Sequence, residues 1–346
     1  MSSPSSGGPE LRVDTTGGFS ASPLETEAAA VAAEAEGYDA LSVPETSHDA
    51  FVSLALAARA TSRIRLQSAI AVAFARNPMT LAYQANDVQL LSGGRFDLGL
   101  GSQVRPHIER RFGMPWSRPA ARMEDFVSAL RAIFDAWATG DRLHHRGEFY
   151  SHTLMTEFFS PGPNPHGIPP VMLAAVGERM TEVAGRVTDG LLAHSLTSPS
   201  YLAEVTLPAL RRGRGRDDLA GFDVCLPVFA VLGADAEARA VAEAGVRRQI
   251  AFYASTPPYR PVLEHHGRGA LADELNGLSR RQAWDEMTGL VDDDLLALFA
   301  VAGDPAEVAS GIADRYRGLV DRVSLNTPYD ADPTLVLDVV TRLRAA

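Results

Sequence analysis

The sequence Leu90-Leu91-Ser92-Gly93-Gly94-Arg95-Phe96-Asp97-Leu98-Gly99-Leu100-Gly101-Ser102 contains the unit from which the whole fold is built. Gly93-Gly94 predicts a turn, and residues 95–100 predict a buried strand that starts directly after it. Gly99 and Gly101 have no side chain, so they allow another part of the backbone to approach the end of this strand. The third glycine and the later acidic residue of a dinucleotide-binding fingerprint are missing. This Gly-x-Gly therefore predicts a close backbone contact, not a Rossmann site.

Short apolar runs of this kind alternate with amphipathic stretches along the chain. Helix starts are marked by Ser22-Pro23-Leu24-Glu25 and Asp304-Pro305-Ala306-Glu307, each with an N-cap residue, proline at the first position and glutamate at the third. Strands are expected at residues 11–15, 40–43, 65–71, 96–100, 171–175, 190–194, 222–232 and 322–327. Eight strands alternating with helices predict an α/β fold, a (β/α)₈ TIM barrel.

We expect one domain from residue 11 to residue 346, preceded by a disordered Ser/Gly/Pro-rich tail at residues 1–10. Two stretches exceed the plain alternation: residues 103–167 after the fourth strand, and residues 255–294 after the seventh helix. Insertions at the carboxyl ends of barrel strands usually build the pocket or its lid.

The composition of the chain narrows the range of possible functions. The 346 residues carry a net charge of −11, which argues against nucleic acid as a partner. The chain has no lysine, which excludes lysine Schiff-base chemistry and ordinary pyridoxal enzymes. Its single cysteine, Cys225, lies in an apolar run and is expected to be a buried core thiol. No signal peptide and no apolar run long enough to span a membrane is seen, so a cytoplasmic protein is expected.

Two further segments suit the chemistry of a bound cofactor. Residues 68–78 run from an apolar strand to Asn77-Pro78, and their small side chains leave the barrel mouth open for a flat ring. Ala174-Ala175-Val176-Gly177 ends the fifth strand directly before a helix, which places free backbone N–H groups where a phosphate can bind. Arg179 can add a bidentate contact. Simple strand packing and a plain strand-to-helix turn remain the alternatives for these two segments.

Together, these segments resemble the luciferase-like monooxygenase superfamily. The resemblance rests on Gly37-Tyr38-Asp39-Ala40, Asn77-Pro78, residues 90–101 and residues 184–190, in register with the eight strands. Within the superfamily, residues 68–78 are similar to the segment in enzymes of the deazaflavin F420 where a non-prolyl cis peptide makes a bulge behind the ring. The resemblance implies that bulge at Ser68–Ala69. It also implies a homodimer through helices beside the second to fourth strands; the apolar residues 51–60 and 79–91 fit such a surface, and packing against the barrel is the alternative for them.

The resemblance and the segment geometry together predict a cofactor site at the barrel mouth. His194, at the end of the sixth strand, is expected to face this mouth and to contact cofactor or substrate. The predicted cofactor-binding residues are Ser68, Ala69, Ile70, Ala71, Gly101, Ser102, Ala174, Ala175, Val176, Gly177, Arg179 and His194.

The sequence departs from the F420 dehydrogenases of this group after the second strand. Glu45 stands where the histidine of their acid–histidine pair aligns, and His48 follows three residues later. Val104 replaces the glutamate that sugar-phosphate enzymes carry after the fourth strand, which argues against a phosphorylated sugar. We therefore expect hydride transfer between C5 of F420 and a small, less polar organic substrate. His48 is the predicted general acid/base, with Glu45 as its partner or substitute; a capping role for His48 is the alternative.

Other functions stay open at this point. One is an FMN-dependent two-component monooxygenase of the same fold, which takes reduced flavin from a partner reductase and activates O₂. Another is a barrel that binds a ligand without catalysis. No metal site is expected, because neither His144-His145 nor His265-His266 has a carboxylate at a recognised ligand spacing.

Overall fold

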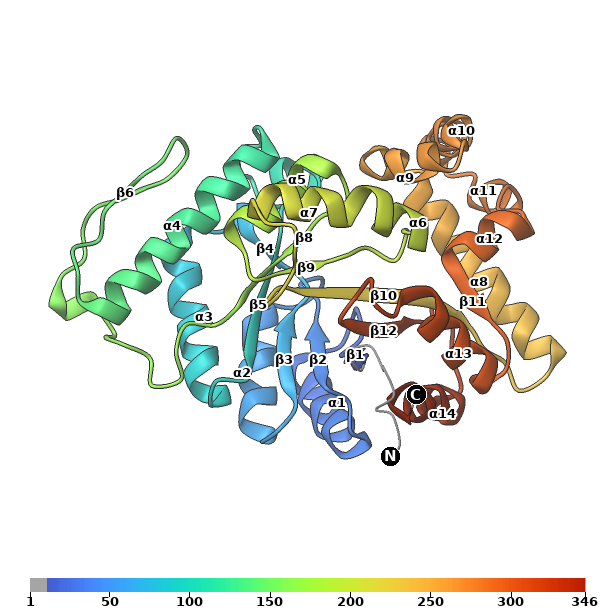
Figure 1. The fold of residues 1–346 in the computed structure, drawn as a ribbon, viewed down its shortest axis with the longest axis horizontal. Coiled ribbons are helices and arrows are strands. Elements are labelled where there is room, and N and C mark those ends of the chain that lie inside the picture. Colours follow the sequence, from blue (N-terminus) through green and yellow to red (C-terminus); the bar gives the residue numbers. More distant parts are fainter. Residues whose placement is uncertain (1–10, 346) are drawn as a thin grey trace, which may run out of the picture.

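The computed structural model describes residues 11–345, which form a closed barrel of parallel strands surrounded by helices (Figure 1). The predicted tail at residues 1–10 lies outside the described residues. Around the barrel the strands follow in chain order, and the last pairs with the first. They are β1 (Arg12–Thr16), β2 (Ala40–Val43), β3 (Arg65–Ser68) with its continuation β4 (Ala71–Val72), β5 (Phe96–Gly101), β8 (Val171–Ala174), β9 (Gly190–Leu192), β10 (Asp223–Val231) and β12 (Arg322–Asn326). The predicted (β/α)₈ barrel is confirmed.

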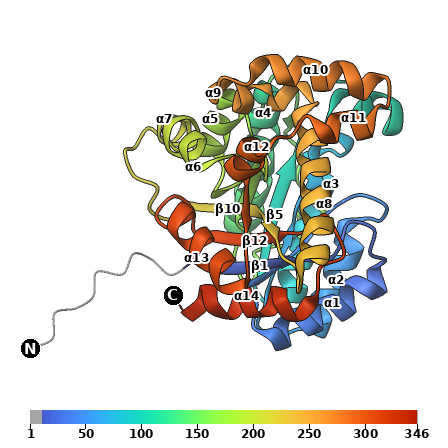
Figure 2. The same cartoon turned by 90° about the vertical axis from the view of Figure 1, so that its right-hand side faces the viewer.

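The helices between the strands form the outer ring (Figure 2). The capping boxes predicted at Ser22 and Asp304 are both present, each with its glutamate bonding back to the backbone of the cap residue. The ring comprises α1 (Pro23–Glu36), α2 (Ala50–Ala60), α3 (Pro78–Ser92), α4 (Pro119–Thr139), α5 (Glu178–Val187), α7 (Leu207–Arg214), α8 (Ala236–Ala254), α13 (Pro305–Tyr316) and α14 (Pro333–Ala345).

Both predicted insertions are ordered additions to this plan. The first holds α4 and the two-stranded ribbon of β6 (His145–Arg146) and β7 (Ser151–His152). The second gathers beside α8 as α9 (Arg260–His265), α10 (Gly269–Arg280), α11 (Trp284–Gly289) and α12 (Asp293–Phe299) (Figures 1 and 2). It leads into β11 (Ala300–Ala302), which pairs with the second half of β10 and was not predicted. A run of three residues is too short to show the period-2 pattern of a strand.

Most of the apolar core lies between the barrel and the helices. The strand residues that point outward, such as Val13, Leu41, Leu66 and Leu98, are fully buried there. Each strand therefore alternates apolar outward positions with smaller or polar inward positions, which is the period-2 pattern of a sheet.

The inside of the barrel is polar at the amino ends of the strands. The Arg322 side chain is 1% exposed, and its guanidinium bonds Asp14 at 2.8 Å and Asp97 at 3.0 Å. Burial raises the pKa of Asp14 to about 6, against the opposing effect of Arg322. Met172, Leu192 and Cys225 form an apolar layer of their own, and burial raises the pKa of the Cys225 thiol. Salt bridges and this apolar layer fill the bottom and middle of the barrel, so a ligand site belongs at the opposite end.

Candidate functional site at the barrel mouth

The third barrel strand is interrupted where the sequence predicts a bulge. β3 ends at Ser68, β4 begins at Ala71, and the peptide bond between Ala69 and Ile70 is cis. The prediction of a cis bond at Ser68–Ala69 is therefore wrong by one residue. The reason is that Ser68 still belongs to the sheet: it pairs with Val43 of β2 and is fully buried. The chain leaves the ladder only after it.

Two glycines of β5 make room for this bulge. A Cβ at Gly99 would lie 1.9 Å from the carbonyl oxygen of Ser68, and one at Gly101 would lie 2.7 Å from the Ile70 side chain. The close backbone approach predicted for this Gly-x-Gly is confirmed at Gly99, whereas at Gly101 the close group is a side chain. Ala69 and Ile70 then pack against the apolar layer that contains Leu192, so the bulge projects into the barrel directly above that layer.

The start of α5 has the geometry of an anion site. Gly177 is the N-cap residue, with extended dihedral angles, and no side chain caps the helix. A Cβ at Gly177 would meet no atom within 4 Å. The Glu178 carboxylate bonds Arg212 at 3.1 Å, which holds its negative charge away from the first turn. The first backbone N–H groups of α5 therefore face open space at the positive end of the helix dipole. Arg179 is exposed beside them.

His194 follows β9 and lies in an aromatic environment. Its ring stacks on Tyr259 with centroids 4.4 Å apart and meets Tyr253 edge-on, also at 4.4 Å. The backbone N–H of Leu196 donates to Nδ1 at 3.1 Å. Burial lowers the pKa of His194 to about 4. The imidazole is therefore neutral near pH 7, and its proton sits on Nε2 because Nδ1 accepts a hydrogen bond.

Glu45 is held by an ion pair at the end of β2. Its carboxylate accepts from the backbone N–H of Val72 at 2.8 Å and from Arg76 at 2.7 Å. Arg76 also bonds Asp49 at 2.9 Å. His48 is exposed and lies near Glu25, whose pKa is lowered by hydrogen bonds with Ser22 and to a smaller extent by His48. The structure thus directs Glu45 to Arg76 and does not bring it together with His48.

The remaining predicted site residues line the same end of the barrel. Gly101 closes β5, and the Ser102 hydroxyl donates to the carbonyl of Gln103 at 3.0 Å. Ala71 opens β4, while Ala174 and Ala175 end β8 beside the bulge and the start of α5. The predicted cofactor-binding segments therefore converge on one mouth.

Histidines of both pairs form hydrogen bonds with protein side chains. His145 bonds Asp125 at 2.7 Å, His265 lies 3.2 Å from the Ser200 hydroxyl, and His266 lies 2.8 Å from the hydroxyl of Ser198. Between residues 11 and 345, no group of three or more His, Cys, Asp or Glu side chains is arranged to hold a metal ion.

Sequence reasoning missed Tyr253, Tyr259 and Arg76. The two tyrosines come from the end of α8 and the start of the second insertion, and only the fold places them against the end of β9. Arg76 lies within residues 68–78, the segment predicted to border the mouth, but it was not among the predicted site residues. A charged residue inside such an apolar segment is a signal that can be used.

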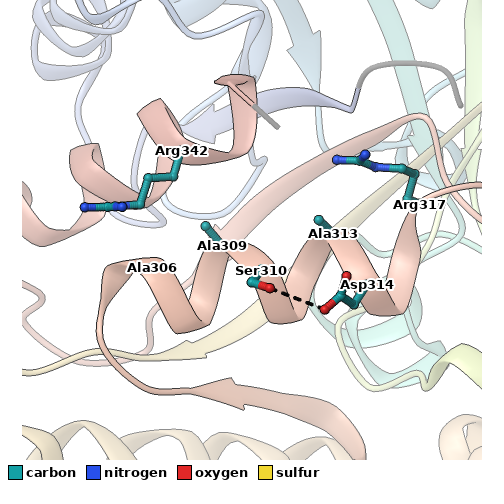
Figure 3. Close-up of a pocket in the computed structure, with 7 residues that line it drawn as sticks. All are labelled: Ala306, Ala309, Ser310, Ala313, Asp314, Arg317 and Arg342. Atoms are coloured by element: carbon teal, nitrogen blue, oxygen red, sulfur yellow. Dashed lines mark hydrogen bonds between the residues drawn. The ribbon is translucent and has the colours of Figure 1, made fainter. Parts of the chain in front are cut away.

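A separate groove of about 530 Å³ lies on the outside of the barrel, between α13 and α14 (Figure 3). Small side chains such as Ala309 and Ala313 form its floor, and Ser310 bonds Asp314 within α13. The groove is lined by residues of α13 and α14 and by Arg317, which follows α13, and it contributes none of the groups described above.

Within residues 11–345, every helix is too short or too polar to span a membrane.

The chain was compared with known proteins. Residues 6–322 match the family model of the luciferase-like monooxygenases. The uncharacterised protein Rv1360 of Mycobacterium tuberculosis is 52% identical over 85% of this chain and 87% of its own length. The 5,10-methylenetetrahydromethanopterin reductase of Archaeoglobus fulgidus is 25% identical over 87% and 88%.

Among solved structures, the coenzyme F420 dependent tetrahydromethanopterin reductase of Methanopyrus kandleri superimposes with a TM-score of 0.76 and 20% identity. The match covers 96% of this chain and 97% of that one. This likeness shows the shared barrel, and the family match shows the relationship. The chain belongs to the luciferase-like monooxygenase family, and it is an oxidoreductase of that family.

Proposed function

We propose that the protein is an F420-dependent oxidoreductase that transfers a hydride between C5 of the deazaflavin and a small organic substrate. The observation that carries the proposal is the pairing of two features at one mouth: a strand interrupted at Ala69–Ile70 and an uncapped helix start at Gly177. A flat ring and an anionic tail are the two parts of such a cofactor. A relative named as a reductase and a structural neighbour whose name includes F420 support the same proposal.

The residues present fit this group. The cradle at Gly177 is open, and the helix start offers N–H donors without a side chain competing for them. The bulge offers backbone and small side chains against which a planar ring can lie. F420, when bound, would supply the hydride carrier. The protein then has to bind and orient the cofactor and the substrate, and to keep water away from both.

Each segment then has a distinct task in the proposal. The backbone of Ser68, Ala69, Ile70 and Ala71 supports one face of the ring, and Gly101 and Ser102 border its edge. Ala174, Ala175, Val176 and Gly177 bind the phosphate through their N–H groups, and Arg179 adds charge at the surface.

His48 stays the proposed proton relay. Glu45 fixes the neighbouring loop through Arg76, which makes it a positioning residue.

Titration of the purified protein with F420, FMN and FAD, followed by absorbance and fluorescence, tests the cofactor. The proposal expects saturable binding of F420. Binding of FMN with no response to F420 would overturn it and leave the family assignment intact.

The second candidate is an FMN-dependent monooxygenase that uses reduced flavin and O₂, and the family membership favours it. The same mouth would serve either cofactor. Incorporation of oxygen from O₂ into a product that requires both the protein and chemically reduced FMN, and none with reduced F420, would establish this second function.

A further inference from the structure

His194 lies one layer nearer the mouth than the bulge. Leu192, on the inner face of β9, packs with Ala69 and Ile70 in the apolar layer of the barrel. The strand pairing continues past Leu192, because Ala193 donates to the carbonyl of Cys225 at 2.8 Å. His194 follows two residues after the end of β9, and the hydroxyl of its neighbour Ser195 accepts from Asn326 at the end of β12. His194 therefore lies at the carboxyl ends of the strands, where the cofactor ring is proposed to bind.

The ring of His194 presents one free donor. Nδ1 is occupied by the N–H of Leu196, and Nε2 has no partner among residues 11–345. The ring faces are covered by Tyr259 and Tyr253, while the side chain remains partly exposed. What is left open is the edge that carries the Nε2 proton. A hydrogen-bond donor fixed by two aromatic rings and a backbone N–H is preorganised for an acceptor on a ligand.

The surroundings of this donor are apolar. Burial is the sole cause that lowers the pKa of His194, and no charged group contributes. Tyr253 packs in turn against Phe229 and Phe252, so aromatic side chains continue behind it. These groups belong to β9, α8 and the second insertion, apart from the segments that bind ring and phosphate.

We propose that the Nε2 proton of His194 binds the carbonyl oxygen of the substrate, and that the substrates are aldehydes or ketones carried on an apolar, preferably aromatic body. The inference rests on the proposed function, because it assigns the substrate side of the same mouth. It also explains how the chain manages without the acid–histidine pair after the second strand: the donor comes from the sixth barrel strand instead.

The chemistry balances with a neutral imidazole. With reduced F420 as the donor, the carbonyl carbon would accept the hydride, the π electron pair of the C=O bond would move to oxygen, and the oxygen would take a proton from water through His48, the proposed relay. The substrate gains two electrons and the deazaflavin loses two. His194 keeps its proton throughout and stabilises the charge that develops on oxygen, as neutral imidazoles do in other enzymes.

Binding of a matched pair of probes tests the inference without turnover. Acetophenone carries the carbonyl, and ethylbenzene has the same shape without the acceptor. Ligand-observed NMR on the F420-saturated protein should give acetophenone at least a tenfold lower Kd. Equal affinities, or binding of neither probe, would overturn the proposal.

Two variants distinguish the role of the hydrogen-bond donor of His194 from the role of its aromatic ring. His194→Phe keeps the aromatic contacts and loses the donor. The preference for acetophenone over ethylbenzene should therefore fall below about threefold, while the Kd for F420 stays unchanged. His194→Gln keeps an N–H donor and should retain most of the preference. A preference that survives in His194→Phe would refute the role. Circular dichroism and thermal unfolding establish that both variants fold.

Binding of F420 to the wild-type protein is a separate result from its preference for acetophenone. If the wild-type protein fails to bind F420 but still prefers acetophenone, the proposed cofactor fails and the carbonyl site stands. If F420 binds and the preference is absent, the carbonyl site fails and the cofactor proposal stands.

Discussion

The hydroxyl of Ser68 bonds both backbone groups of Gly99: it donates to the carbonyl and accepts from the N–H, each at 2.9 Å. In a regular sheet, backbone groups of the third strand would occupy those positions. The side chain thus replaces a piece of the ladder at the point where the strand turns inward.

Gly99→Ala should destabilise the protein strongly. The added Cβ would lie 1.9 Å from the Ser68 carbonyl oxygen and 2.8 Å from Leu192, and the first contact is with backbone that cannot move aside. We expect a loss of about 2–4 kcal/mol in the free energy of unfolding, as for other overpacked or strained core sites. Urea unfolding measures it.

The matched control is Gly277→Ala, in the middle of α10, where a Cβ meets no atom within 4 Å. That change should leave stability equal or raise it by up to about 1 kcal/mol. Similar values for the two variants would contradict the close approach at Gly99.

Glu45→Gln should weaken the fold of the mouth. The Glu45 and Arg76 side chains are 9% and 11% exposed, so loss of the carboxylate leaves a buried guanidinium with Asp49 as its one remaining carboxylate and a 3.4 Å contact to the carbonyl of Val72. We expect a loss of about 2–3 kcal/mol in the free energy of unfolding, somewhat below the usual range for breaking a buried pair because Asp49 remains.

Asp49→Asn is the control. Asparagine still caps α2, and the Asp49 carboxylate is largely exposed, so the loss in the free energy of unfolding should stay below about 1 kcal/mol. If Glu45→Gln abolishes turnover at full stability, Glu45 is catalytic instead.

Gly177→Asp should separate stability from cofactor binding. Gly177 has N-cap dihedral angles and open space at its Cβ position, so aspartate fits and caps α5, with a gain of a few tenths of a kcal/mol at most. The new carboxylate occupies the proposed phosphate position, and affinity for F420 should fall at least about tenfold. Gly177→Asn caps without charge and should lose much less. Unchanged affinity in Gly177→Asp would remove this helix start from the site.

His194 should make the protein sensitive to acid. Its pKa is lowered from 6.5 to about 4 in the folded state, so the unfolded chain binds the proton more tightly. The stability it contributes is complete above pH 6.5 and is lost as the pH falls toward 4. Linkage gives about 2 kcal/mol lost between pH 7.5 and pH 5. In His194→Gln this part of the loss should disappear, which urea unfolding at the two pH values measures. Identical losses in both proteins would show that His194 is not buried in its neutral form.

The barrel could be predicted from sequence because its signals are local. Alternating apolar runs locate the strands, and capping residues such as Ser22 and Asp304 locate helix starts within a residue or two. The helix start at Gly177, where we propose the anion site, was predictable for the same reason, since Gly177 stands between a strand and a helix.

What escaped prediction depends on contacts between distant residues. The position of the cis bond follows from the way Ser68 is held by Gly99, 31 residues later. The aromatic walls around His194 come from Tyr253 and Tyr259, which reach it only after an entire strand, a helix and a loop have packed. No spacing rule in a single sequence connects residues of this kind.

The salt bridge between Asp14 and Arg322 joins residues 308 positions apart. Until β12 arrives, Asp14 lacks its cation and Asp97 has only Arg65, and the final seam is also the slowest kind of contact for a chain to find. A circular permutant that links α14 to β1, which are in contact, and opens near the exposed Pro161 would make the Asp14–Arg322 pair a far more local contact. Its last seam would then lie between β5 and β8, so the salt bridge inside the barrel should form before that seam closes.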